Sequence, residues 1–309
     1  MRAVVFAYHN VGARGLRTLL AGGMRVELVV THPDDPGETI WFDSVAAVAA
    51  EHGIPVALVD QAVDDALLER IARLAPDYIF SFYFRRMLPA SLLAAARIAA
   101  LNMHGSLLPQ YRGRVPVNWA VLHGEAETGA TLHVMEAKPD AGDIVAQQAV
   151  PILPDDTAKD VFDKVTVAAE IALWGVLPRL LRGEVPRRSN NLAQGSYFGG
   201  RKPEDGRIDW RQPAQVIYNL MRAVAPPYPG AFFDLNGRRF IVARARLARP
   251  EVAALLPASA SAGLHLAQEQ ILAKGNDGGV IHILELWAAD HPGQPLSAQH
   301  LSELAGHQP

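Results

Sequence analysis

The stretch Ile98-Ala-Ala-Leu-Asn102-Met-His104-Gly-Ser-Leu-Leu-Pro109 carries the most information about the fold of this chain. Its first seven residues are mostly apolar, which predicts a short buried strand that ends at His104. Residues two apart on a strand point to the same side, so Asn102 and His104 should project together, roughly 6.6 Å apart along the chain. The glycine and proline that follow end the strand. The pair therefore lies at its carboxyl end, where open α/β sheets bind their ligands.

Short apolar runs alternate with helical patterns through the first half of the chain. Strands are expected at 3–7, 26–31, 55–59, 78–82 and 100–104, and helices at 13–21, 44–52, 63–74 and 90–95. This alternation predicts an α/β fold with a doubly wound, mainly parallel sheet. A further strand pair is expected at 131–135 and 143–150, and Asp155-Asp-Thr157 then caps a helix over 158–181.

The chain changes character after residues 183–200, which are rich in Arg, Asn, Ser and Gly and show no periodicity. A helix is expected from about 210 to 224, and short strands at 238–243, 263–267 and 280–286. Gly and Asn turns separate these strands, which predicts a small β barrel or sandwich. We therefore expect a catalytic domain at 1–189, a linker at 190–203 and a smaller barrel-like (OB-like) domain at 204–309.

Composition excludes several classes of site. The 309 residues carry a net charge of -3, which disfavours a nucleic-acid partner, and the absence of cysteine excludes disulfides and thiolate metal sites. The turn Tyr8-His-Asn-Val-Gly12-Ala-Arg-Gly15 lacks the paired glycines of a dinucleotide-binding loop. The N-terminal apolar run is too short for a signal peptide and no run matches a membrane span. We expect a cytoplasmic protein that inserts into no membrane.

Three motifs connect the chain to a known family. Asn102-x-His104-Gly-Ser-Leu-Leu-Pro109 is followed by Tyr111-Arg-Gly-Arg114-x-Pro116 and by Asp140-Ala-Gly142. Together they resemble the folate-dependent formyltransferases, and the resemblance covers essentially the whole chain. It is closest to the domain that formylates UDP-4-amino-4-deoxy-L-arabinose and more distant to methionyl-tRNA formyltransferase. Bifunctional forms carry a second, NAD-dependent domain; because this chain stops at Pro309, we expect a stand-alone transferase.

The resemblance implies a reaction and three catalytic residues. A formyl group would pass from 10-formyltetrahydrofolate to the amine of UDP-4-amino-4-deoxy-L-arabinose, a UDP-amino sugar, in the modification of lipid A and lipopolysaccharide. The Asn102 amide and a protonated His104 would donate to the oxyanion, and His104 would protonate the leaving folate nitrogen. Asp140 is the carboxylate expected to favour the imidazolium and a candidate to receive the amine proton.

Binding residues follow from the resemblance and from residue chemistry. The resemblance places the folate at Arg86, Met87, Leu88, Arg114, Glu136, Ala137, Lys138, Pro139 and Asp140. For the sugar nucleotide, residue chemistry suggests Tyr8, Ser106, Tyr111, Arg112, Arg201 and Tyr228, because arginines bind diphosphate and tyrosines stack on uracil or sugar. No metal is expected: His123 and His133 lack short ligand spacing and are interpreted as ordinary hydrogen-bonded histidines.

Other functions stay open at this point. The same chemistry serves methionyl-tRNA formylation, which the mild acidity disfavours, and formylation of another nucleotide-linked amino sugar. A catalytically silent regulator that binds folate or a sugar nucleotide is the alternative from another class. Taken singly, Asn102, His104 and Asp140 each have an ordinary structural explanation, but their combination at this spacing favours catalysis. The choice of amino sugar and nucleotide, and assembly into a homo-oligomer, are left open by the sequence.

Overall fold

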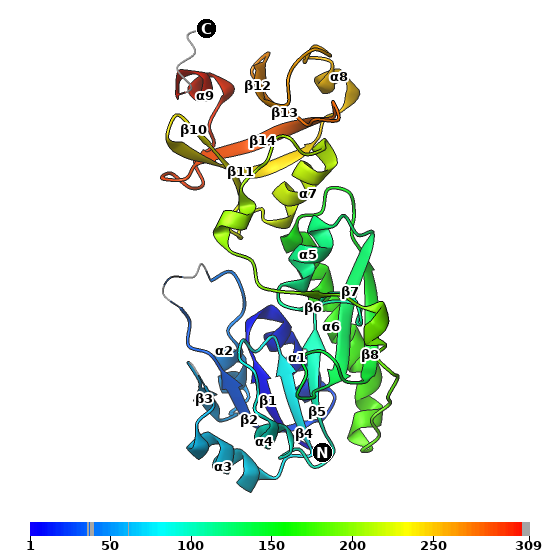
Figure 1. Ribbon diagram of the computed structural model, residues 1–309. Coiled ribbons are helices and arrows are strands. Elements are labelled where there is room, and N and C mark those ends of the chain that lie inside the picture. The colour runs from blue at the N-terminus through cyan, green and yellow to red at the C-terminus, as the bar shows by residue number, and fades with distance from the viewer. Residues whose placement is uncertain (36, 38–39, 61, 305–309) are drawn as a thin grey trace. The chain divides into compact units, whose positions relative to one another are not determined.

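The computed structural model describes residues 1–35, 37, 40–60 and 62–304 (Figure 1). The chain divides into two compact units. The first comprises Met1–Pro116, Glu127–Pro151 and Phe162–Gly199, and the second comprises Val117–Ala126, Ile152–Val161 and Gly200–Pro309. The second unit therefore includes two short segments that lie in the sequence between parts of the first.

The first unit is built on a seven-stranded sheet with the order β3-β2-β1-β4-β5-β7-β8. Its strands are β1 (Arg2–Ala7), β2 (Arg25–Thr31), β3 (Val56–Leu58), β4 (Tyr78–Phe82), β5 (Ala99–His104), β7 (Glu127–Val134) and β8 (Ile144–Pro151). The first five are parallel, whereas β7 and β8 run antiparallel to their neighbours. The prediction of a mainly parallel α/β sheet is confirmed, with the order reversing between β1 and β4.

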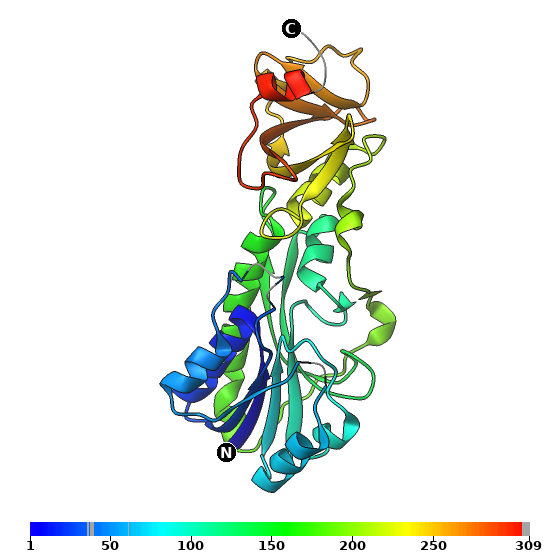
Figure 2. The same cartoon turned by 90° about the vertical axis from the view of Figure 1, so that its left-hand side faces the viewer.

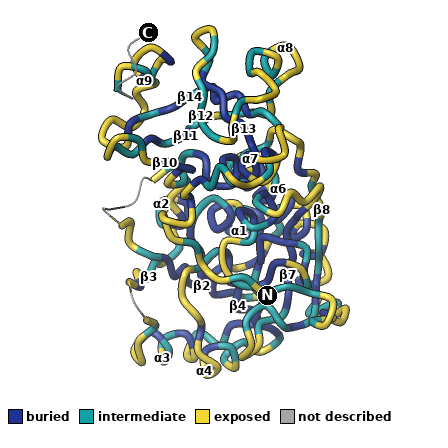
Figure 3. Tube along the Cα trace, turned by 45° about the horizontal axis from the view of Figure 1, so that its top comes forward, coloured by how far each residue is buried: buried dark blue, intermediate teal, exposed yellow. Residues whose placement is uncertain are grey.

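Helices cover both faces of this sheet (Figure 2). One face carries α1 (His9–Ala21), α2 (Val45–Glu51) and most of α6 (Ala158–Leu181), and the other carries α3 (Asp65–Leu74) and α4 (Ala90–Leu93). Alternate residues of β1 face the two layers, so Val4 and Phe6 enter the core beneath α3 and α4. Figure 3 shows that the central strands are buried.

Side chains cap the starts of α2 and α6, and the cap of α6 was expected from the sequence. The Ser44 hydroxyl accepts a hydrogen bond from the N–H of Ala47 at the start of α2. At the start of α6, the Asp160 N–H donates to the Thr157 hydroxyl, and the Asp160 carboxylate accepts from the Thr157 N–H at 2.9 Å. This reciprocal pair is a capping box, and α6 has the bounds expected from the sequence.

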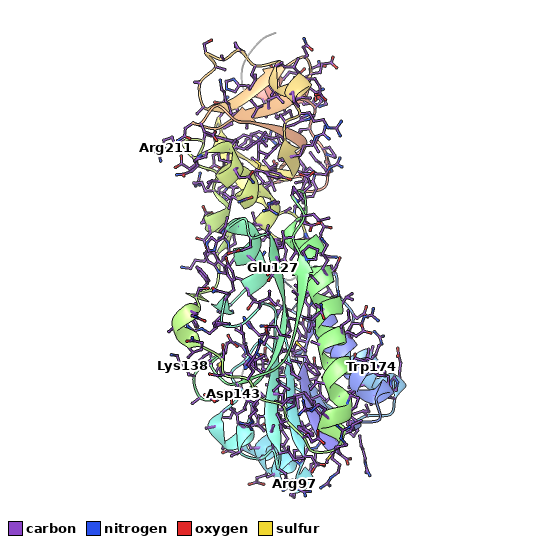
Figure 4. All side chains as sticks on the ribbon, turned by 90° about the vertical axis from the view of Figure 1, so that its right-hand side faces the viewer. Arg97, Glu127, Lys138, Asp143, Trp174 and Arg211 are labelled. Carbon is purple, nitrogen blue, oxygen red and sulfur yellow. The ribbon has the colours of Figure 1, made fainter. Side chains whose placement is uncertain are left out.

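The outer side of α6 bears large apolar residues, among them Trp174 (Figure 4). Val167, Ile171 and Trp174 are four and three residues apart and therefore lie along one side of the helix. Of the helices in the described part of the chain, none combines the length and the hydrophobicity that crossing a bilayer requires.

The second unit contains a curled antiparallel sheet with the order β10-β11-β14-β13-β12. Its strands are β10 (Ala231–Leu235), β11 (Arg238–Leu247), β12 (Gly263–Ala267), β13 (Gln270–Lys274) and β14 (Val280–Ala288). A shared apolar core joins the sheet to α7 (Ala214–Ala223) and α9 (Ala298–Leu304). This half-barrel confirms the expected class of the smaller domain.

Several local expectations need correction. The strands β10 and β13 were not expected, and α7 begins at Ala214 instead of residue 210. The segment 183–200 is not without structure, because β9 (Tyr197–Phe198) pairs with β6 (Arg112–Gly113) and a 3-10 turn covers Leu192–Gln194. The remaining short helices are α5 (Pro116–Leu122), α8 (Pro250–Ala253) and the 3-10 turn Pro203–Gly206.

Candidate active site

The strands β5 and β7 bring three polar side chains to one face of the sheet. Asn102 and His104 lie two residues apart on β5, and antiparallel pairing sets His133 of β7 directly opposite Asn102. The Nδ2 atom of Asn102 lies 3.0 Å from Nε2 of His133. His104 and His133 are buried, with 7% and 2% of their surfaces exposed. The sequence expectation that Asn102 and His104 project together is consistent with this arrangement.

Asp140 reaches the same cluster from the loop between β7 and β8, which Lys138 and Asp143 mark in Figure 4. Its Oδ1 atom lies 3.6 Å from Nδ1 of His104 and 3.5 Å from Nε2 of His133. Its other oxygen, Oδ2, accepts a hydrogen bond of 2.8 Å from the Gly113 N–H. His104, His133 and Gly113 thus converge around the Asp140 carboxylate.

The backbone at Asp140 is held in a conformation that non-glycine residues rarely adopt. Its φ is +51°, and Asn190 fixes the loop by donating to the Asp140 and Gly142 carbonyls at 3.0 and 3.2 Å. Tyr111, which precedes Arg112 on the opposite side of the cluster, also has a positive φ of +55°. Strain of this kind gathers at functional sites, where surrounding contacts outweigh its cost of about 1–3 kcal/mol.

The protonation of His104 follows from its partners. Its Nε2 lies 2.7 Å from the Tyr111 carbonyl, so Nε2 carries the proton and Nδ1 carries the lone pair in the neutral ring. Burial lowers the pKa of His104 below its ordinary 6.5, and this effect outweighs the opposing influence of Asp140. The ring is therefore neutral at pH 7. The sequence expectation of a protonated His104 counted the neighbouring carboxylate but not the burial, which acts on the pKa in the opposite direction.

Asp140, in contrast, stays ionised. Burial acts to raise its pKa, but the two histidine rings and the Gly113 N–H together bring the pKa down to about 2. An ionised carboxylate has no proton to donate, so the Nδ1 lone pair of His104 remains available to accept one. The pair thus joins a neutral base to a fixed negative charge.

His133 is the residue that sequence reasoning missed. Its Nδ1 lies 2.9 Å from the Val134 carbonyl and therefore donates, which leaves Nε2 as the acceptor for the Asn102 amide. This contact turns the nitrogen end of Asn102 toward His133. The signal available in the sequence was a histidine on the strand before Asp140, but its register against Asn102 was unknown. His123, considered beside it, lies in the second unit.

The residues suggested for the folate lie in two loops of the first unit, which follow β4 and β7, and at Arg114 after β6. Arg86 donates from Nε and Nη2 to the Asp60 carbonyl at 3.2 and 2.9 Å, Met87 is 67% exposed, and Leu88 is buried. Arg114 is exposed, and its N–H donates to the Phe198 carbonyl. In the second loop, Glu136, Ala137 and Lys138 are exposed and Pro139 is half-buried beside Asp140.

The residues suggested for the sugar nucleotide are found in different environments. Tyr8 is buried beneath the Arg85 guanidinium, and Tyr111 stacks on Phe198 with ring centres 5.3 Å apart. Ser106 has no exposed surface, and its hydroxyl donates to the Gln110 carbonyl at 2.6 Å. Its surroundings therefore give it a structural role in the loop after β5, in place of the substrate contact suggested from the sequence.

Arg112 differs from these because it is a buried cation. Only 9% of its surface is exposed, and Nε makes no hydrogen bond to the described residues. Its neighbours Tyr111 and Gly113 supply the carbonyl that holds His104 and the N–H that holds Asp140. Arg112 therefore lies between the two residues whose backbone groups contact His104 and Asp140.

Arg201 and Tyr228 belong to the second unit. The Arg201 guanidinium lies over the Trp119 ring, 4.9 Å from its centre, and donates to the Asp205 carbonyl at 2.9 Å. Trp119 is half-buried, and Tyr228 lies after the end of α7. These contacts give Arg201 a packing role within its own unit.

Solved structures of similar shape include two formyltransferases and HypX. An N-formyltransferase from Helicobacter canadensis, solved with folinic acid and dTDP-3-aminofucose, is 21% identical, has a TM-score of 0.70, and covers 91% of this chain and 98% of its own. A 4-N formyltransferase from Francisella tularensis is 20% identical, with a TM-score of 0.62 and coverage of 80% and 98%. HypX from Aquifex aeolicus, with tetrahydrofolic acid, gives 19% identity, a TM-score of 0.63 and coverage of 98% and 47%.

Family models cover most of the sequence. The model described as formyl transferase matches residues 1–177, which contain Asn102, His104, His133 and Asp140, and the model of its C-terminal domain matches residues 201–299. The three structures share the fold of this chain, and the first family model alone spans more than half of it. The chain therefore belongs to the formyl transferase family.

Proposed function

We propose that this protein transfers the formyl group of 10-formyltetrahydrofolate to the primary amine of a nucleotide-linked amino sugar. The observation that carries the proposal is the convergence of Asn102, His104 and Asp140 in a formyl transferase fold. Relatives of the same fold are sugar N-formyltransferases, one of them solved with folinic acid and a dTDP-sugar. We propose UDP-4-amino-4-deoxy-L-arabinose as the first acceptor to test, and lipid A and lipopolysaccharide modification as the setting.

The first chemical step is attack of the acceptor amine on the formyl carbon. A new C–N bond forms and the carbonyl oxygen becomes an oxyanion. The Asn102 amide has two N–H bonds, of which one points to His133, so the second is available to donate to that oxyanion. Preorganised donors of this kind are worth about 2.7–4 kcal/mol each in acyl transfer.

The second step moves a proton. Neutral His104 accepts the proton of the attacking amine at Nδ1, and the resulting imidazolium then faces Asp140 at 3.6 Å. The Tyr111 carbonyl keeps the other nitrogen protonated throughout, so the ring holds one tautomer. The imidazolium gives this proton to the folate nitrogen as its bond to the formyl carbon breaks. Atoms and charge balance, since the proton passes from the amine to the leaving nitrogen.

We propose that Arg112 helps to bind the acceptor. Burying a guanidinium without a carboxylate costs free energy, and among the described residues no carboxylate lies within 4 Å of Arg112. We assign Arg112 to the diphosphate of the sugar nucleotide, whose oxygens match a guanidinium. The loops that contain Arg86, Met87, Leu88, Arg114 and Glu136–Pro139 remain our proposal for the folate.

The test is an assay of a panel of acceptors with 10-formyltetrahydrofolate. The release of tetrahydrofolate is monitored, and the formylated product is identified by mass spectrometry. The panel contains UDP- and dTDP-linked sugars with the amine at carbon 3 or carbon 4, and methionyl-tRNA. We expect turnover of a nucleotide-linked amino sugar and none of the tRNA. Turnover of the tRNA alone would replace the acceptor we propose, and turnover of nothing would favour a silent binding protein.

A further inference from the structure

The second unit contains a cavity of about 310 Å³ that the proposed reaction does not use. Its walls come from the residues before and at the start of α6, from α7, and from β11 and β14. The lining residues are Asp155, Thr157, Asp160, Tyr218, Met221, Arg222, Ala225, Val242, Ala243, Arg244, Ala245, Arg246 and Leu284. All of them belong to one unit. Its volume falls at the lower end of the range for small-molecule sites.

A paired irregularity in the sheet shapes this cavity. Between Val242 and Arg244, β11 has one extra residue against β14, and one step later β14 has one extra residue against β11. The extra residues are Ala243 and Leu284, and both line the cavity. Bulges break the strict alternation of side chains and re-aim them, and they recur beside functional sites. Here they allow five consecutive residues of β11 to line one space.

Arg222 supplies a buried positive charge on the helical side of the cavity. Only 6% of its surface is exposed. Nε donates to the Asn219 side chain at 3.0 Å and Nη1 donates to the Asp156 carbonyl at 3.2 Å. These contacts fix the plane of the guanidinium. Within the described residues, Nη2 makes no hydrogen bond, and no carboxylate lies within the 4 Å of a salt bridge.

Arg246 supplies a second positive charge on the sheet side. Its Nε atom is buried and has no hydrogen-bond partner in the described part of the chain. Its cross-strand neighbour is His282. Burial and the charge of Arg246 lower the pKa of His282, so the histidine is neutral at pH 7 and this pair carries a single positive charge. No salt bridge to Arg246 is formed by any described residue.

The acidic residues at the cavity are already engaged. Asp155 accepts a hydrogen bond of 2.7 Å from the Tyr218 hydroxyl, and Asp160 accepts from the N–H and the hydroxyl of Thr157. Arg244, the third arginine, lies 3.9 Å from Glu285, at the limit of an ion pair, and is largely exposed. Arg222 and Arg246 therefore both line the cavity, and no described carboxylate forms a salt bridge with either guanidinium.

We propose that this cavity binds a small organic oxyanion, a carboxylate or a phosphate ester, between Arg222 and Arg246. A guanidinium presents paired N–H donors that match the oxygens of either group. Each arginine has nitrogen atoms that the protein itself does not use, so an arriving oxyanion completes both sets of hydrogen bonds. Tyr218 and Met221 provide an apolar wall for the organic part of the ligand.

The proposal is tested by titration calorimetry of the full chain with inorganic phosphate and, separately, with malonate. The variants are Arg246→Gln and Arg222→Lys. The matched control is Arg238→Gln, which removes a half-buried arginine of β11 that pairs with Asp290 outside the cavity. We expect binding to the native chain and to the control, and affinity lower by about tenfold or more in both cavity variants. The stronger of the two probes identifies the class of the oxyanion.

Two results would overturn this assignment. The first is the absence of heat with both probes up to tens of millimolar, and the second is equal affinity in the native chain, Arg246→Gln and Arg222→Lys. Because Arg222 is buried, melting temperatures of all variants are measured beside the titrations, and Arg246→Gln alone decides if Arg222→Lys does not fold. Binding here is measured without any formyl transfer, so the result is independent of the proposed enzymatic function.

Discussion

The amide nitrogen of Asn102 lies 3.0 Å from Nε2 of His133, and the other ring nitrogen of His133, Nδ1, donates a hydrogen bond to the carbonyl of Val134. This chain of contacts sets the tautomer of the histidine and, through it, the direction in which Asn102 presents its N–H groups. An isolated asparagine turns its oxygen or its nitrogen outward with similar ease. In the proposed mechanism His133 is therefore a positioning residue for Asn102, the oxyanion donor.

Replacing His133 tests this positioning role. His133→Phe removes the acceptor, so Asn102 loses its fixed orientation and kcat is expected to fall by about tenfold to a hundredfold. KM for both substrates should stay within about threefold, because neither contact is to substrate. His133→Gln restores an acceptor atom and should recover much of the rate. An unchanged kcat in His133→Phe would remove His133 from the mechanism.

The protonation of His104 is directly measurable. Because its pKa is lowered by burial, the ring should be neutral at pH 7, protonated on Nε2, and should become charged only below pH 6.5. Nitrogen-15 spectra of labelled histidines over a pH series report both the charge and the tautomer. Asp140 favours the charged ring, so Asp140→Asn should move the titration to still lower pH. An imidazolium at pH 7 would contradict the role of His104 as a base.

Arg112 should matter for the acceptor and not for the folate. Arg112→Met is expected to raise KM for the nucleotide-linked sugar by about tenfold or more, with kcat and the KM for 10-formyltetrahydrofolate little changed. Arg97→Met is the matched control, because Arg97 is exposed and precedes the amino end of β5 (Figure 4). The assignment fails if both variants keep the native KM for the sugar nucleotide.

A glycine at position 113 is required by the backbone conformation there, and its N–H also contacts Asp140. Its φ is +100°, a Cβ there would lie 2.2 Å from the Phe198 carbonyl oxygen, and its N–H holds Asp140. Gly113→Ala should therefore cost more than about 2 kcal/mol in unfolding free energy and lower turnover. Gly175→Ala is the control, since a Cβ on this helical glycine meets nothing within 4 Å. Urea denaturation should show it as stable as the native chain or more so.

Local patterns in the sequence predicted much of the first unit. The alternation on β5 set Asn102 and His104 on one face, and Thr157 marked the start of α6. The strands β10 and β13 escaped prediction because neither alternates apolar with polar residues and each contains an apolar run of only three residues. The turn between β10 and β11 was foreseen, and Asn236 and Gly237 adopt the positive φ values that a tight hairpin needs.

The site itself was predictable only in part. Asn102, His104 and Asp140 were recognised as motif residues, but the contribution of His133 depends on the register of two antiparallel strands. That register is set by packing and pairing along the whole ribbon, and spacing in the sequence does not encode it. The charge of His104 depends likewise on burial by residues from several elements, which its carboxylate neighbour alone does not reveal.

The most direct test of the central claim is single-turnover formyl transfer by His104→Asn and Asp140→Asn beside the native chain. Each variant is mixed with 10-formyltetrahydrofolate and the acceptor that the panel identifies, and tetrahydrofolate release is followed by absorbance. The account predicts a fall of about a hundredfold to ten-thousandfold in each variant, with native circular dichroism retained. Near-native rates in both variants would contradict it.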